Sequence, residues 1–264
     1  MTRKRVGLAL SGGVMRGAAH VGVIMELERA GIPIDYVAGV SAGSIVGSLL
    51  CAGITPVRMA ELSGELRWSA IASLVWPRDG FVSFAKLARW LIRIIGDRAF
   101  DELTIPFAAG VTDLETGAPV MISDGKVAVA VHASCAVPGL VVPVRDHGHV
   151  WGDGGISFNL PGMAVRAMGA DYVIGVDLMQ PKLRRRGGPL RYGITAVEVL
   201  IERSGGGLNA VDCLITPQLA GFTYFDSGRF GDLVGLGQQA AAAQLDTIRA
   251  ALGMSVDTPQ LSDR

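Results

Sequence analysis

Short apolar segments alternate with helical segments along this sequence, and this alternation constrains the fold more than any other feature. Residues 6–10 form an apolar run that ends in a glycine turn, and residues 16–30 then carry apolar side chains at helical spacing. Residues 36–38 and 41–52 repeat the same order. Alternation of this kind predicts an α/β protein with an open, mostly parallel sheet that helices cover on both faces.

The individual elements are predicted from apolar runs, helix caps and helix breakers. The predicted strands are 6–10, 36–38, 107–112, 119–122, 141–144, 149–151, 172–178 and 213–217. The predicted helices are 16–30, 41–52, 56–66, 127–134, 162–168, 194–208 and 233–252. Because sites in such sheets lie at the carboxyl ends of the strands, the loops that follow the first two strands are the first places to search for chemistry.

The composition is that of a globular protein, with half of the residues apolar and 18% charged. The formal net charge is zero, and a neutral chain is not expected to bind nucleic acid. Three widely spaced cysteines, Cys51, Cys135 and Cys213, lie in apolar surroundings. They predict reduced core thiols, with no disulfide and no metal site, and nothing indicates a cofactor.

Neither a leader nor a membrane span is strongly indicated. The apolar run after the basic N-terminal residues is too short for a signal peptide. Residues 36–57 carry no charge and are numerous enough to span a bilayer, but their glycines and serines favour a buried strand and helix. We therefore expect a cytoplasmic protein that is soluble or peripheral to a membrane.

Residues 39–43 form the pattern G-x-S-x-G, with Ser41 at its centre. A short apolar strand precedes the pattern and a helix of small residues follows it, which is the context of a nucleophilic serine on a sharp turn. Side chains at Gly39 and Gly43 would collide in such a turn, so both positions need glycine. The alternative is a simple tight turn in which Ser41 caps the helix.

A nucleophilic serine needs a base, and two assemblies are open. Asp153 follows a short predicted strand in the run Gly-Asp-Gly-Gly, where Gly154 and Gly155 allow a close approach to another loop. All four histidines precede Asp153, so the usual order of serine, acid and histidine cannot be built around it. A Ser41–Asp153 dyad is the simpler assembly, a triad with His132 or His149 is the other, and a plain hairpin turn at 152–155 is a third interpretation.

The first predicted strand ends in Ser-Gly-Gly at 11–13, and a helix follows. Glycines at a strand-to-helix turn expose backbone N–H groups, which suits the oxyanion of an acyl transfer. A phosphate-binding loop is the main alternative. The turn lacks the Lys-Ser/Thr of a P-loop and the spacing of a dinucleotide fingerprint.

These motifs together resemble the patatin-like phospholipase family. The resemblance is carried by "GGVMRGAAHVGV", "GVSAGS" and "GDGG", and extends to "TDLETG" at 112–117, "ASCAVPG" at 133–139 and "NLPG" at 159–162. It covers about residues 5–180. It implies a three-layer α/β/α fold, a Ser41–Asp153 dyad and a lipid ester as substrate. It further implies an oxyanion hole from Gly12, Gly13 and the position of Val14, in a loop held by Arg16.

Val14 departs from the family, which usually has a third glycine at this position. A β-branched residue does not easily adopt a positive φ. Two outcomes follow from the sequence: either one oxyanion donor is misaimed, or Val14 supplies its N–H from an ordinary conformation.

Residues 1–264 are expected to form one domain with a frayed tail at 254–264. Segment 67–104 holds Trp68, Trp76 and Trp90 and predicts helical pieces that are either core or a lid over a pocket. The basic cluster at 182–186, with Arg191 after it, is either a solvated loop or a patch for an anionic membrane surface. The oligomeric state stays open.

Three functions are compatible with these patterns. The first is a serine acyl hydrolase that cleaves phospholipid or lysophospholipid esters. The second is a non-catalytic lipid-binding or regulatory protein on the same fold, which Val14 favours. The third is a soluble esterase or thioesterase without a membrane role.

Overall fold

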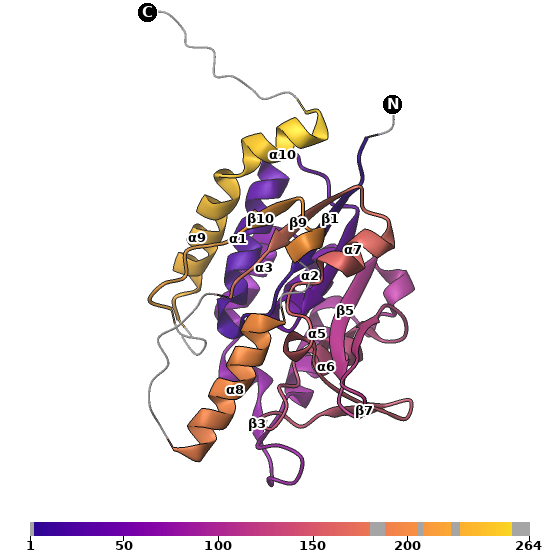
Figure 1. Cartoon of the computed structure of the whole chain (residues 1–264), viewed down its shortest axis with the longest axis vertical. Coiled ribbons are helices and arrows are strands. Elements are labelled where there is room, and N and C mark those ends of the chain that lie inside the picture. The colour runs from indigo at the N-terminus through magenta and orange to yellow at the C-terminus, as the bar shows by residue number, and fades with distance from the viewer. Residues whose placement is uncertain (1–2, 180–187, 205–207, 223–227, 255–264) are drawn as a thin grey trace, which may run out of the picture.

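An eight-stranded mixed sheet forms the centre of the computed structural model, which describes residues 3–179, 188–204, 208–222 and 228–254 (Figure 1). The strand order is β10-β9-β1-β2-β5-β8-β7, with β6 also paired to β5. The parallel strands are β1 (Val6–Leu10), β2 (Tyr36–Val40), β5 (Phe107–Asp113), β9 (Tyr172–Val176) and β10 (Cys213–Ile215). The antiparallel strands are β6 (Pro119–Ile122), β7 (Val144–Asp146) and β8 (His149–Asp153).

Helices cover both faces of this sheet, but unequally. The larger core lies between the sheet and α1 (Ala18–Arg29), α2 (Ala42–Cys51), α3 (Pro56–Glu65), α5 (Ala85–Ile95), α6 (Val127–Ser134), α9 (Phe230–Ala242) and α10 (Leu245–Leu252). The smaller core lies on the opposite face, against α7 (Gly162–Met168). Figure 1 shows α1 and α9 on one side of the strands and α7 on the other. This arrangement confirms the predicted three-layer α/β/α fold with a mostly parallel central sheet.

Side-chain size explains the unequal layers. In β1, Val6, Leu8 and Leu10 face the larger core, whereas Ala9 faces α7. A Cβ atom on Gly7 would lie only 2.0 Å from Cγ1 of Val165 in α7. The small residues of the strand therefore allow α7 to pack closely on this face, since successive side chains of a strand point to opposite faces.

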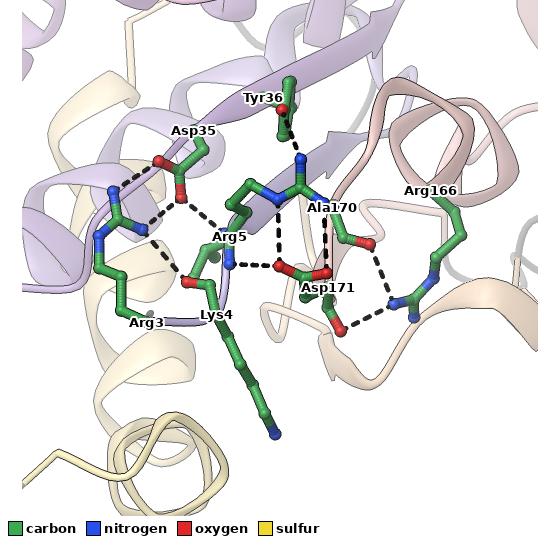
Figure 2. Close-up of polar contacts among 9 residues, drawn as sticks. Arg3, Lys4, Arg5, Asp35, Tyr36, Arg166, Ala170 and Asp171 are labelled. Atoms are coloured by element: carbon green, nitrogen blue, oxygen red, sulfur yellow. Dashed lines mark hydrogen bonds and ion pairs between the residues drawn. The ribbon is translucent and has the colours of Figure 1, made fainter. Parts of the chain in front are cut away.

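Charged residues tie together the amino ends of the parallel strands (Figure 2). Arg3 pairs with Asp35, and the carboxylate of Asp35 also accepts the Val6 N–H at 2.7 Å. Arg5 pairs with Asp171, which also accepts the Arg5 N–H at 2.9 Å. Because Asp35 precedes β2 and Asp171 precedes β9, these contacts hold the edge of the sheet opposite to the carboxyl ends.

The 67–104 region contains a feature that the sequence analysis did not predict. After the short helix α4 (Trp68–Ile71), strands β3 (Ser73–Leu74) and β4 (Val82–Ser83) form an antiparallel hairpin. The prediction of helical pieces is correct for α4 and α5, and buried side chains of α5 pack in the larger core. The hairpin was missed because each strand has only two residues, too few to show an alternating pattern.

Three other predicted elements differ from the structure. Segment 141–144 is not a strand as a whole, because β7 begins at Val144 and Val141 makes only an isolated bridge. The predicted helix 233–252 is divided into α9 and α10, which lets Leu245 and Ile248 of α10 pack in the core. Helix α8 (Pro189–Arg203) begins and ends five residues earlier than predicted, with Pro189 at its first position.

Segment 36–57 consists of β2, α2 and the start of α3. Within the described ranges, every helix is too short or too polar to cross a membrane. All three cysteines are free and buried, as predicted. The predicted basic cluster at 182–186, and residues 255–264 of the predicted tail, lie outside the described residues.

Candidate active site

Ser41 lies on a strained turn between β2 and α2. Its φ is 52° and its ψ is −120°, a conformation that side-chain-bearing residues rarely adopt. A Cβ atom on Gly39 would lie 2.3 Å from the Gly43 carbonyl oxygen, and one on Gly43 would lie 2.3 Å from that of Leu10. The turn can form only because both positions are glycine, which is the geometry expected of a nucleophile elbow.

Two serine side chains hold this turn. The Ser41 N–H donates to Oγ of Ser134 at 2.8 Å, and the Ser134 hydroxyl donates to the Gly110 carbonyl at 2.6 Å. The Ser44 hydroxyl donates to the Ser41 carbonyl at 2.7 Å. All three serines are buried, so these bonds fix the backbone of Ser41 with little competition from water.

Strand register brings Asp153 to the same level of the sheet as Ser41. Val40 of β2 pairs with Gly110 of β5, and the next residue of β5, Val111, pairs with Asp153 at the end of β8. Strand β6 pairs with the other edge of β5, so β2 and β8 lie end to end along the same edge, and Ser41 and Asp153 meet where they adjoin. A Cβ atom on Gly154 would lie 2.4 Å from the Gly110 carbonyl oxygen, so glycine is required at the turn after Asp153.

The environment of Asp153 suits a base that works near neutral pH. Burial raises the pKa of the Asp153 carboxyl to about 6, while hydrogen bonds from the Ser41 hydroxyl and the Gly155 N–H act to lower it. The Gly155 N–H lies 2.8 Å from Oδ1 of Asp153. The run 152–155 is thus a strand end followed by a 3₁₀ turn, and the hairpin interpretation is wrong.

The glycine-rich loop after β1 lies directly against the serine. A Cβ atom on Gly12 would lie 3.3 Å from Cβ of Ser41. The Gly12 N–H donates to Oδ1 of the buried Asn159 at 3.0 Å, so it is already occupied. The N–H groups of Gly13 and Val14 have no hydrogen-bond acceptor among the described residues.

Val14 begins a 3₁₀ turn, Val14–Gly17, with a φ of 53°. This value lies in the left-handed region, which is costly for a β-branched residue. The possibility that Val14 supplies its N–H from an ordinary conformation is therefore wrong for this structure. The backbone instead takes the conformation that suits a glycine, and the valine side chain is 36% exposed.

Arg16 is buried beneath the loop. Its backbone N–H donates to the Gly13 carbonyl at 3.1 Å, and its guanidinium lies 4.0 Å from the sulfur of Met179. Burial raises the pKa of Asp177, and the positive charge of Arg16 opposes that shift. These contacts connect the glycine-rich loop to the end of β9.

A cavity of about 480 Å³ contains both Ser41 and Asp153. These two residues form its polar end together with the glycine-rich loop and Asn159. Most of the remaining wall is apolar and comes from α2, α3, α4, α5, α8 and the loop after α6; it includes Ile45, Leu66, Trp68, Ile71, Phe84, Leu87, Val137, Leu140, Val197 and Ile201. Such a cavity suits a long apolar group with one polar reacting end.

None of the four histidines, all of which lie in the described part of the chain, lines this cavity. His149 stacks on Trp151 and contacts Asp113 at 3.2 Å. His132 is on α6, where burial lowers its pKa. Asp153 is the carboxyl group that the structure brings into hydrogen-bond contact with the Ser41 hydroxyl.

Cys135 is another potential nucleophile in the cavity wall. Burial raises the pKa of its thiol, and the negative charge of Asp153 raises it further. The thiol stays protonated at neutral pH and is a poor nucleophile. Within the described ranges, no three His, Cys, Asp or Glu side chains gather into a set that could hold a metal ion.

Sequence reasoning missed two residues that support the site, Ser134 and Asn159. Both lie in motifs on which the family resemblance rests, "ASCAVPG" and "NLPG". Their roles depend on contacts over 93 and 147 residues of chain, which local patterns do not reveal.

Comparison with known proteins identifies the family of this chain. The model of the patatin-like phospholipase family matches residues 8–165. The lysophospholipase nte1 of Aspergillus fumigatus is 34% identical over 181 residues, and lysophospholipase NTE1 of Saccharomyces cerevisiae is 29% identical over 199 residues. The matches cover 66% and 73% of this chain, but only 12% of the length of either relative.

Two solved structures share the fold at 15% sequence identity. VipD from Legionella pneumophila has a TM-score of 0.57 over 93% of this chain and 67% of its own. ExoU from Pseudomonas aeruginosa, in complex with SpcU, has a TM-score of 0.54 over 95% of this chain and 53% of its own. At this identity the likeness supports the fold alone.

Proposed function

The chain belongs to the patatin-like phospholipase family, and from this premise we propose that it is a serine hydrolase that cleaves carboxylic esters of lipids. One observation carries the proposal. A serine on a strained elbow and a buried carboxyl with a pKa of about 6 share one cavity whose remaining wall is mostly apolar. The curated relatives are lysophospholipases, which makes a phospholipid or lysophospholipid the first substrate to test.

The first half of the proposed reaction is acylation. Asp153 accepts the proton of the Ser41 hydroxyl as Oγ attacks the ester carbonyl carbon. The carbonyl oxygen becomes an oxyanion, which the N–H groups of Gly13 and Val14 stabilise. The tetrahedral intermediate then collapses, and the alcohol leaves with the proton from Asp153. The acyl group remains on Ser41.

In deacylation, a water molecule takes the place of Ser41 as the nucleophile, and Asp153 again acts as the base. Asp153 takes a proton from a water molecule, which attacks the acyl carbonyl carbon of the acyl-enzyme. A second tetrahedral intermediate breaks the bond to Ser41, and the Ser41 oxygen regains its proton from Asp153. The fatty acid leaves, and the apolar wall of the cavity accommodates its chain in both steps.

Because substrates of this kind reside in membranes or micelles, the proposal includes peripheral contact with an anionic membrane surface. The lid interpretation of segment 67–104 belongs to the same proposal. Four of its side chains, Trp68, Ile71, Phe84 and Leu87, form part of the cavity wall.

Release of fatty acid from a lysophospholipid tests the function. Ser41→Ala should lower the rate by at least about 10³-fold, and Asp153→Asn by about 10²-fold or more. Ser48→Ala is the matched control, because Ser48 is a buried serine on α2 whose hydroxyl bonds only within its helix.

The alternatives predict other results in the same assay. A soluble esterase or thioesterase cleaves a short-chain ester and leaves the lysophospholipid intact. A non-catalytic lipid-binding protein, folded and pure, cleaves neither. If His132→Ala or His149→Ala abolishes the rate while Asp153→Asn retains it, the dyad is wrong and a triad is right.

A further inference from the structure

The segment 67–95, which contains α4, the β3–β4 hairpin and α5, concentrates positive charge. It holds five basic residues, Arg67, Arg78, Lys86, Arg89 and Arg93, and one acidic residue, Asp79. Its net charge is therefore +4, whereas that of the whole chain is zero. Asp79 pairs with Arg145, and none of the five basic residues forms an ion pair within the described part of the chain. Unpaired positive charge on a neutral chain indicates an anionic partner.

The tip of the hairpin exposes large apolar side chains. Leu74 is 87% exposed, Trp76 is 82% exposed and Phe81 is 46% exposed. Figure 1 shows this loop projecting from the lower end of the molecule. Protein segments at the membrane–water interface often combine tryptophan and leucine with unpaired arginine. There the indole ring of tryptophan can be buried in lipid while its N–H stays in contact with water.

Backbone contacts fix the hairpin in place. The Val75 N–H donates to the Phe81 carbonyl at 3.1 Å, and the Phe81 N–H donates to the Leu140 carbonyl at 2.9 Å. The Val142 N–H donates to the Val82 carbonyl at 2.8 Å, so the chain after α6 clamps the base of the hairpin. The exposure of Leu74 and Trp76 is therefore a property of an ordered element.

A second, small pocket lies between α4 and α5. Lys86, Arg89 and Arg93 follow one face of α5 and line this pocket together with Ala70 and Trp90. The Lys86 ammonium group donates to the Ser69 carbonyl at 3.2 Å, and no carboxylate of the described residues lines the pocket. Three cations around one hollow suit the phosphate of a lipid headgroup.

The same segment also faces the catalytic cavity. Trp68 and Ile71 of α4, and Phe84 and Leu87 beside the hairpin, line the cavity that contains Ser41. One continuous segment thus presents apolar side chains inward to the acyl site and apolar and basic side chains outward.

We propose that segment 67–95 is the membrane-docking surface of this protein. Leu74, Trp76 and Phe81 enter the interface of an anionic bilayer, and the five basic residues bind lipid phosphates around them. This inference rests on the proposed function, because docking places the wall of the catalytic cavity next to its lipid substrate. It assigns the membrane contact to this segment and not to the basic cluster at 182–186.

Co-sedimentation with vesicles tests the proposal. Ser41→Ala protein is used so that the vesicles stay intact, and it is mixed with vesicles of neutral phosphatidylcholine or with added phosphatidylserine. Leu74→Ser/Trp76→Ser should lower binding at least about tenfold, since both apolar anchors are lost. Arg89→Ser/Arg93→Ser should lower binding to anionic vesicles roughly 30-fold at low salt and much less at high salt.

The control variants make the same kinds of substitution outside segment 67–95. Val57→Ser and Met163→Ser remove exposed apolar side chains of α3 and α7, and Arg58→Ser/Arg249→Ser removes two charges. None of these variants should reduce binding comparably. Hydrolysis of a soluble short-chain ester by the hairpin variants in the Ser41-containing protein should stay unchanged, because Leu74 and Trp76 do not line the cavity.

The outcomes separate docking from catalysis. Equal binding of wild type, hairpin variants and controls overturns the docking proposal, even if the protein hydrolyses the soluble ester. Loss of binding in the hairpin and arginine variants supports docking, even if no ester is cleaved. If Trp76→Ser instead shifts the protein from dimer to monomer on size exclusion without changing vesicle binding, the tip is a protein interface and the proposal is wrong.

Discussion

Asp153 is a buried acid, and its proposed role as a base requires it to be ionised. Because burial raises its pKa to about 6, we expect kcat/KM to fall about tenfold per pH unit below pH 6 and to reach a plateau above about pH 7. Initial rates with a soluble short-chain ester between about pH 4.5 and pH 8.5 measure this, with circular dichroism to show that the fold persists. A flat profile, or a profile that His149→Ala shifts, would contradict the role of Asp153.

The raised pKa of Asp153 also predicts how the stability of the fold depends on pH. Since the folded pKa of about 6 lies above the ordinary value of 3.8, the folded state retains a proton that the unfolded state releases. The stability contributed by this group is complete below pH 3.8 and is lost as the pH rises through about 6. In the Asp153→Asn variant the side chain is neutral at every pH, and its amide oxygen can still accept the Gly155 N–H.

Asp153→Asn should therefore raise the free energy of unfolding at about pH 8, by on the order of 3 kcal/mol relative to wild type, and should give no gain near pH 4. Urea unfolding at the two pH values measures the difference. An inactive variant that is more stable only at high pH is the expected result. A pH-independent difference would mean that Asp153 has an ordinary pKa in the folded protein.

Val14 carries a φ of 53° that glycine would adopt without strain. Val14→Gly should raise the free energy of unfolding by about 1 kcal/mol, since the relief of strain exceeds the added entropy of the unfolded chain. Turnover should be unchanged or higher, because the N–H groups keep their direction. Val14→Ala retains a Cβ atom, so its free energy of unfolding should rise by less than that of Val14→Gly. A well-folded Val14→Gly protein with much lower turnover would show that the valine itself aids the reaction.

Residue patterns predicted the two residues of the proposed dyad better than the contacts that surround them. Ser41 was predicted from a G-x-S-x-G pattern whose glycines reflect local crowding. The glycines around Asp153 left a hairpin turn open, and the family resemblance implied the dyad. The occupied N–H of Gly12 was not foreseen, because it depends on where Asn159 meets the loop in space. The sequence marked Val14 as a poor fit to a positive φ but left its conformation open.

At the scale of elements, α6 supports the elbow between β2 and α2 through Ser134. Ser134→Ala leaves the Ser41 N–H and the Gly110 carbonyl buried without this partner. We expect a loss of about 1–3 kcal/mol in unfolding free energy and a lower kcat with little change in KM, since the elbow would shift. Ser48→Ala should lose less stability and keep the kcat of wild type, because the Ser48 hydroxyl donates to the Ile45 carbonyl within α2. Equal kcat in both variants would exclude a positioning role for Ser134.

Elements were predicted well where the sequence carries a local marker. Helix α6 and helix α7 have the predicted limits, and Thr55 caps α3 by accepting the Arg58 N–H. The division between α9 and α10 has no glycine or proline to mark it, and the β3–β4 hairpin is too short for a pattern. The close contact of α1 with α9, where a Cβ atom on Gly22 would lie 1.9 Å from the Val234 carbonyl oxygen, likewise requires the tertiary structure.

At the scale of the whole molecule, the two edges of the sheet have different tasks. Ion pairs hold the amino edge (Figure 2), and the carboxyl edge carries the strained serine and the glycine-rich loop. The sequence alternation predicted this polarity, because parallel strands place their carboxyl ends together. It could not predict that Asp153 arrives on an antiparallel strand, since the pairing of β8 with β5 joins residues far apart in the chain.

Labelling with a fluorophosphonate tests the central claim, that Ser41 is a nucleophile activated by Asp153. The reagent reacts with activated serines, and mass spectrometry of the digested protein locates the adduct. We predict one adduct, on Ser41, that is absent in Ser41→Ala, slowed at least about 10²-fold in Asp153→Asn and unchanged in Ser63→Ala, which removes another serine of the cavity wall. A folded wild-type protein that is not labelled, or an adduct that persists in Ser41→Ala, would contradict the claim.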